Sequence, residues 1–195
     1  DGRSVWLRSQ KITLDGKRIE IALQDVTDQN PEDFHIFCQN GFLDDSYFFR
    51  SYWTYGRRVG GGYGAWFRAG RLVPSGRILC FDDVRVYGYG RKPQYMLNSS
   101  VIEYQLFAAD KAVAPDAIEK VAATDRAIDA RSTYQNASSS DWRALHFFPP
   151  EDLSAAKLQW KLDQPAIIAR AMTVTDDTLF IAGPPDLIDE RQAYH

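Results

Sequence analysis

Two stretches of the chain, residues 78–88 and 172–183, carry the same pattern. In each, an apolar run leads into a pair of aspartates, and a second apolar run follows; the pairs are Asp82-Asp83 and Asp176-Asp177. Asp is favoured in tight turns, and short apolar runs on both sides of a turn are typical of β-hairpins. We predict that both stretches are antiparallel hairpins in equivalent places of successive structural units.

Other parts of the sequence continue this β-rich pattern. Residues 5–8 and 18–23 flank an Asp15-Gly16 turn signal and predict a first strand pair, and further extended runs lie at 35–39, 101–108 and 157–162. Recurring units of short antiparallel strands favour a β-propeller. At roughly 40 residues per blade, the chain has room for about four blades. The predicted fold is therefore all-β, with antiparallel β-propeller-type blades or part of a propeller, in a single β domain over residues 1–195.

One segment lacks the alternating apolar pattern. Residues 115–130 are rich in Ala, Ile, Glu, Lys and Asp with apolar residues at helical spacing, and residues 134–141 are rich in Ser and Asn. We predict an insertion of about residues 114–154 that carries one short helix and a flexible loop. The insertion is expected to lie outside the sheets, and its deletion is expected to leave a folded protein.

Charge and hydropathy argue against some classes of function. The formal net charge is -3 and the pI is near 5.6, whereas a nucleic-acid or anionic-membrane partner requires a basic face. No apolar run reaches the roughly 20 residues of a membrane span, and no signal-peptide pattern opens the chain. Because the sequence begins at Asp1 and ends after a polar run, we expect an excised piece or a processed form of a longer polypeptide.

An aromatic segment at residues 42–67 is the main candidate for a contact surface. It combines Phe, Tyr and Trp with several arginines and a glycine run at 60–62. Two interpretations stay open: a small core beneath a long loop, or a surface that presents aromatic faces and Arg donors to a glycan or a protein. For the second interpretation the candidate binding residues are Arg50, Tyr52, Trp53, Tyr55, Arg57, Arg58, Tyr63 and Trp66.

The sequence contains no complete catalytic or metal-binding motif. His35, His146 and His195 are scattered, so we name no catalytic residue and no metal ligand. The two aspartate pairs have a turn interpretation, which we favour, and a calcium or catalytic interpretation. Cys38 and Cys80 lie in apolar runs and are predicted to be buried thiols, with a disulfide between them as the alternative.

Several motifs together resemble those of a known family. If the insertion is removed, residues 104–111 run on to residues 158–161 as an apolar strand ending in Ala-x-Asp, a turn, and a strand that carries Trp160. Other runs that contribute to the resemblance lie at 41–46, 52–56, 70–79, 86–93 and 179–186. These runs resemble the C-terminal region of bacterial PQQ-binding-like, or quinoprotein-like, β-propeller repeat proteins. The resemblance implies a structural role for Trp160 between neighbouring sheets and a periplasmic or extracellular location.

From these observations we predict a non-enzymatic binding or scaffold module of an exported bacterial protein, which contacts a protein or a glycan and requires no cofactor. The alternative is a fragment of a quinoprotein dehydrogenase, which would use PQQ and calcium with a stacking Trp and a catalytic Asp. Because an isolated part of a propeller leaves open sheet edges, the expected partners are other parts of a parent polypeptide or another protein subunit.

Overall fold

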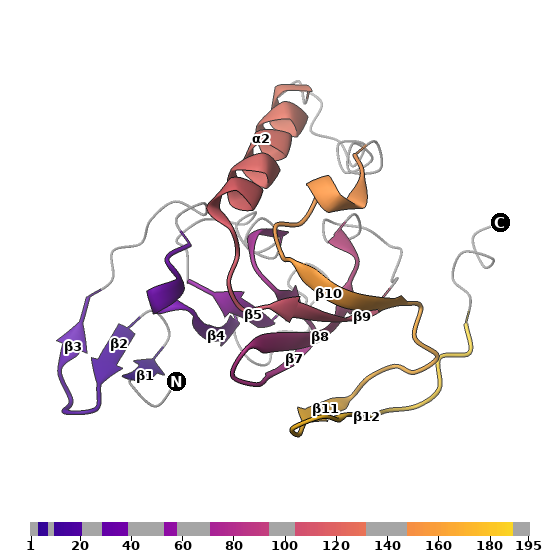
Figure 1. Cartoon of the computed structure of the whole chain (residues 1–195), viewed down its shortest axis with the longest axis horizontal. Helices are drawn as coiled ribbons and strands as arrows, with labels where there is room; N and C mark the ends of the chain where they lie inside the picture. The colour runs from indigo at the N-terminus through magenta and orange to yellow at the C-terminus, as the bar shows by residue number, and fades with distance from the viewer. Residues whose placement is uncertain are drawn as a thin grey trace.

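The structure is a computed structural model (Figure 1) that describes residues 4–7, 10–20, 29–38, 53–57, 71–93, 104–131 and 148–188. The strands in these residues form four antiparallel sheets: β1 (Ser4–Leu7), β2 (Gln10–Thr13) and β3 (Arg18–Ile19); β4 (His35–Cys38), β5 (Trp53–Gly56) and β6 (Ser75–Gly76); β7 (Ile78–Phe81), β8 (Arg85–Arg91), β9 (Tyr104–Asp110) and β10 (Leu158–Asp163); and β11 (Ala171–Val174) with β12 (Leu179–Ala182). The helical elements are α2 (Pro115–Arg131) and the 3-10 helices η1 (Pro31–Asp33) and η4 (Pro150–Asp152). The mainly antiparallel β fold is thus confirmed, and the propeller stays a prediction.

The largest sheet is a meander in which β7, β8, β9 and β10 follow one another in chain order. In β8 and β9 the register pairs Tyr87 with Ala108 and Tyr89 with Leu106. Residues that pair directly point to the same face of a sheet, so these four side chains share one face. The other face carries Val86 and Phe107, both of which are buried. Both faces of the two central strands are therefore covered.

Both aspartate stretches are two-stranded antiparallel hairpins, as predicted. Their turns differ by one residue relative to the aspartates. The first turn begins at Asp82, whose backbone N–H donates to the carbonyl of Arg85, whereas the second begins at Thr175, whose N–H donates to the carbonyl of Thr178. Side chains alternate between the two faces of a strand. Residues of the two hairpins that match when the aspartates are aligned therefore lie on opposite faces in the structure.

The predicted pairing of residues 5–8 with residues 18–23 is wrong. The Asp15-Gly16 turn joins β2 to β3, and β1 pairs with β2. Gly16 has a φ of +85°, which glycine adopts without strain, and the N–H of Thr13 donates to the carbonyl of Lys17 across the turn. The turn prediction is confirmed. The sequence does not predict the strand at residues 10–13, because these residues include only one strongly apolar side chain.

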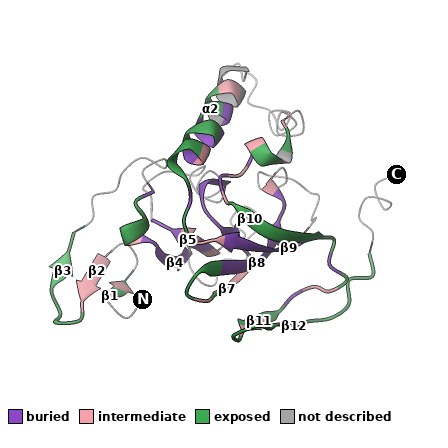
Figure 2. Ribbon diagram, in the orientation of Figure 1, coloured by how far each residue is buried: buried purple, intermediate pink, exposed green. Residues whose placement is uncertain are grey.

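The predicted insertion contains a helix and, in its described residues, no strand. It is nevertheless part of the core, because Ile118 and Val121 of α2 are buried against Phe34 and Val73. Figure 2 shows buried positions on α2 alternating with exposed ones. Beyond the helix, Leu153 is fully buried and the N–H of Ala155 donates to the carbonyl of Arg71. These contacts argue against the expectation that residues 114–154 are dispensable, and deletion of the segment would test it.

A second core lies between the β7–β10 sheet and the β11–β12 hairpin. It is built on Tyr89, Leu106 and Ala169, with Met172 and Ile181 of the hairpin packed against them. Burial, together with the neighbouring Tyr104 and Asp186, raises the pKa of Tyr89 to about 12. The hairpin therefore covers the face of the sheet that carries Tyr89 and Leu106.

Candidate binding surface

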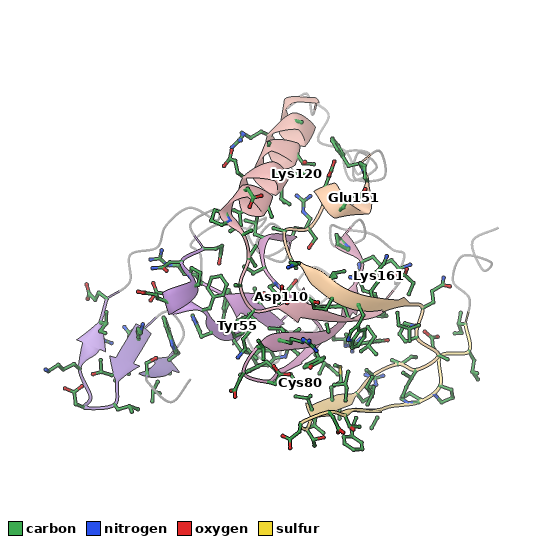
Figure 3. The ribbon with its side chains drawn as sticks, viewed as in Figure 1. Tyr55, Cys80, Asp110, Lys120, Glu151 and Lys161 are labelled. Carbon is green, nitrogen blue, oxygen red and sulfur yellow. The ribbon has the colours of Figure 1, made fainter. Side chains whose placement is uncertain are left out.

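Tyr55 packs internally, between two sheets. It lies on β5, with its ring centroid 5.9 Å from that of Phe34 and 5.7 Å from that of Phe81 on β7. The ammonium of Lys111 lies 5.6 Å from the same ring centroid. Burial raises the pKa of the Tyr55 hydroxyl. Figure 3 shows Tyr55 between the strands. These contacts fit the core interpretation of this position better than the contact-surface interpretation.

Arg57 is buried at the end of β5. Its Nε lies 3.6 Å from Oδ2 of Asp33, and its backbone N–H donates to Oε1 of Gln29 at 2.9 Å. The other carboxylate oxygen of Asp33 lies 3.3 Å from the ammonium of Lys11 on β2. Asp33 therefore links the sheet of β1–β3 to the sheet of β4–β6. The role of Arg57 in these contacts is structural.

The remaining candidate residues of the aromatic segment are less informative. Trp53 is half-buried on β5, where it pairs with Cys38 on one side and with Gly76 on the other. The other five lie outside the described residues: Arg50, Tyr52, Arg58, Tyr63 and Trp66. For them the binding role stays a prediction.

Asp82 has a turn role. Its Oδ1 accepts hydrogen bonds from the backbone N–H groups of Val84 and Arg85, both at 2.7 Å, and its Oδ2 accepts one from the hydroxyl of Tyr87 at 2.8 Å. Burial raises the pKa of Asp82, but these hydrogen bonds outweigh it and the pKa is lowered overall. Asp177 accepts from the hydroxyl of Thr178. In the described residues, no group of three or more His, Cys, Asp or Glu side chains is arranged to hold a metal.

Cys80 is a half-buried free thiol on β7. Burial raises the pKa of this thiol, and the charge of Asp82 raises it further. The side chain of Cys38 lies outside the described part of the structure. The prediction of a thiol is therefore confirmed for Cys80, although its burial is only partial.

A cavity of about 370 Å³ lies between β10 and η4. Its charged lining groups include Lys92, Glu151, Lys161 and Asp163, of which Figure 3 labels Glu151 and Lys161. The carboxylate of Asp163 lies 3.5 Å from the ammonium of Lys92 and 3.2 Å from that of Lys161. Burial raises the pKa of Asp163, but the two lysines outweigh burial and lower it overall. Two cations and two carboxylates give the cavity no charge preference for a ligand.

Among the described residues, three of the four large apolar side chains that the main sheet exposes lie on β10: Leu158, Trp160 and Leu162; the fourth is Phe81 on β7. Leu162 pairs with Leu106 of β9 and Trp160 pairs with Ala108, so all four side chains share the face that the β11–β12 hairpin covers. Leu106 is 7% exposed, whereas Leu162 is 51% and Trp160 is 40% exposed. The cover therefore stops between β9 and β10. We call Trp160 and Leu162 the uncovered apolar pair.

The hairpin itself is exposed on its outer face. Met172, Leu179 and Ile181 pack on the sheet, so Phe180 points to the opposite side, where it is 55% exposed. When the two hairpins are aligned on their turns, Phe180 occupies the position of Tyr87. Tyr87 is only 9% exposed; its hydroxyl bonds to Asp82, and its ring centroid lies 6.4 Å from that of Trp160 on β10. Each hairpin thus turns the same face toward the sheet before it, and among the described residues the opposite face is buried at Tyr87 and Tyr89 but exposed at Phe180.

The sequence of β10 contains a signal for this surface, outside the aromatic segment at residues 42–67. Leu158, Trp160 and Leu162 alternate with Gln159, Lys161 and Asp163, a pattern typical of a strand with one apolar face. A bulge between Leu158 and Trp160 breaks the alternation, so Leu158 points to the other face and lines the cavity. The pattern predicts an apolar face but does not say what covers it.

Comparisons with protein-family models, with curated proteins and with solved structures gave no match. The likeness to quinoprotein-like propeller proteins therefore stays a prediction from the sequence motifs. No helix in the described part of the chain is long and apolar enough to cross a membrane.

Proposed function

We propose that this chain is a non-enzymatic binding or scaffold module, and that polypeptide docks on the main sheet at the uncovered apolar pair. The observation that carries the proposal is the contrast between Leu106 and Leu162, which are register partners on one face. The first is buried and the second is half exposed. Burying a leucine side chain contributes about 1.5–3 kcal/mol, so a partner that covers the pair gains a substantial apolar contribution.

The arrangement of the strands supports this proposal. Four antiparallel strands in chain order are the arrangement of a β-propeller blade. The sheets are stacked in chain order, since β7 contacts the sheet of β4–β6 through Phe81 and Tyr55 and the β11–β12 hairpin follows on the other side. The outer strand β10 also has one edge with no paired strand among the described residues. Open edges and uncovered apolar faces are features that a neighbouring chain can cover.

The identity of the partner rests on the chemistry of this surface. Apolar side chains next to main-chain groups favour a protein partner, either the rest of a parent polypeptide or another subunit. The sequence motifs that resemble bacterial quinoprotein-like propellers support an exported protein in the periplasm or outside the cell. Tyr55 and Arg57 do not belong to the proposed surface, since both have internal contacts.

The test places a photo-activated cross-linking amino acid at Leu162 in the producing cell. A matched control places it at Lys17, which is exposed in the β2–β3 turn. We expect one defined cross-linked polypeptide from position 162, identified by mass spectrometry, and none from position 17. The Trp160→Ser variant should weaken that cross-link while unfolding at nearly the wild-type temperature. Equal labelling from both positions would contradict the proposal.

A further inference from the structure

The second hairpin lacks the strands that continue the first. β7 and β8 are the first two strands of a four-stranded sheet, and β9 pairs with the outer edge of β8. β11 and β12 are the turn-aligned counterparts of β7 and β8, but they form a sheet of two strands in the described part of the chain. A two-stranded sheet is only marginally stable by itself in water. The counterpart of β9 would pair with β12.

The outer edge of β12 offers main-chain groups at defined residues. The carbonyls of Thr178 and Ala182 accept hydrogen bonds from the β11 side, from the N–H groups of Thr175 and Arg170. Because backbone groups alternate between the two edges of a strand, those of Leu179 and Ile181 point away from β11. Past Gly183 the pairing continues, since the N–H of Ile168 donates to the carbonyl of Pro184. Arg170 and Ala171 both lie opposite Ala182, so the register shifts by one residue there and the regular edge of β12 spans Leu179–Ala182.

The cover of the main sheet is incomplete on the side of β10. The hairpin buries Tyr89 and Leu106 on β8 and β9 and leaves Trp160 and Leu162 on β10 exposed. A strand added beyond β12 extends the covering sheet. The repeat places that strand over the outer part of the main sheet, toward the uncovered apolar pair.

We propose that β12 binds an extended segment of a partner polypeptide by antiparallel strand addition, with apolar residues at alternate positions of that segment. This inference rests on the proposed function and names the form of its partner. The main-chain bonds supply pairing, and the alternate apolar side chains pack beside Leu162. The chain's own β9, which fills the corresponding place on β8, has this character in Phe107 and Ala109, which lie on the face that corresponds to Leu179 and Ile181 of β12.

The test uses a synthetic peptide with the sequence of residues 104–111 as the probe. We expect saturable binding to the intact protein, followed by hydrogen exchange. The amides of Leu179 and Ile181 should become protected, whereas that of Phe180, which faces β11, should not change. Two further probes carry N-methyl groups on odd or on even residues only. One of them should bind roughly 30-fold more weakly, because it loses two hydrogen bonds to β12, and the other should bind like the parent peptide.

Two results would overturn the inference. One is the absence of probe binding at millimolar concentration, and the other is equal affinity of both N-methylated probes, since main-chain pairing requires that they differ. A cross-link at Leu162 together with either result would leave the proposed function standing and remove strand addition as its form.

Discussion

Ile118 should stabilise the packing of α2 against the rest of the protein. Its side chain is 6% exposed and packs in the core cluster that contains Phe34, Leu72 and Val73. Replacing a buried isoleucine by alanine costs about 2–5 kcal/mol, through lost burial and the cavity that remains. We expect Ile118→Ala to lower the free energy of unfolding by about 3 kcal/mol. Since folded domains are stable by only about 5–15 kcal/mol, this is a large fraction of the total.

The measurement is urea unfolding followed by circular dichroism and by tryptophan fluorescence. The matched control is Glu119→Ala on the same helix, where the side chain is 66% exposed and pairs with Arg126 at the surface. Exposed ion pairs contribute about 0–1 kcal/mol, so this variant should remain close to wild type. A loss in Ile118→Ala no larger than in Glu119→Ala would show that α2 merely lies over the sheets.

Deletion of residues 114–154 should destabilise the protein more than the single substitution. The deletion removes Ile118, Val121 and Leu153, all of which are buried. We expect the deleted protein to lose its cooperative unfolding transition, in contrast to the expectation from composition. A sharp transition near the wild-type midpoint, by both probes, would refute the assignment of this segment to the core.

Asp82→Ala should lower the free energy of unfolding by about 1–2 kcal/mol, because three donors lose their acceptor, whereas Asp177→Ala should change it much less. The pKa of Asp82 is lowered in the folded state, so the stability that its ionised carboxylate contributes is present above about pH 4 and is lost as the pH falls through the lowered pKa. In urea titrations at a series of pH values, the free energy of unfolding of Asp82→Ala should therefore fall less in acid than that of wild type. Gly88→Ala should destabilise by about 1–3 kcal/mol, since a Cβ there would lie 2.2 Å from Cζ of Phe107, and an unchanged unfolding midpoint would contradict that packing. PQQ with calcium should give no thermal shift and no dye-linked oxidation, because a ligand that does not bind the native state cannot stabilise it; quinone-dependent turnover would replace the binding-module proposal by the enzyme alternative.

The sequence predicted features that depend on neighbouring residues in the chain. Both aspartates make local contacts in their turns: Asp82 accepts from the backbone N–H of Val84, and Asp177 accepts from the hydroxyl of Thr178. Such contacts need no distant partner. The helical spacing at residues 115–130 predicted α2, which spans Pro115–Arg131. The strands at 101–108 and 157–162 were predicted to within a few residues, and their direct pairing followed from removal of the segment between them.

Features that depend on packing were not predictable in the same way. Tyr55 and Arg57 have residue types that suit either a core or a contact surface, and only their contacts with Phe34, Phe81 and Asp33 distinguish the two. The one-residue shift between the hairpins was hidden because the aspartates align in the sequence while the turns do not. The packing of Tyr55 and Arg57 and the register of the hairpins both depend on contacts between residues that are distant in the sequence.

The sequence by itself determined the local structure of this protein: where the chain turns, where it is helical, and which strands have one apolar face. The tertiary structure decided which of those faces are covered. Leu106 and Leu162 are both leucines that pair on one face of the main sheet, yet the β11–β12 hairpin buries the first and stops short of the second. Alternation along a strand is set by backbone geometry within a few residues, whereas burial depends on where a distant segment ends in space.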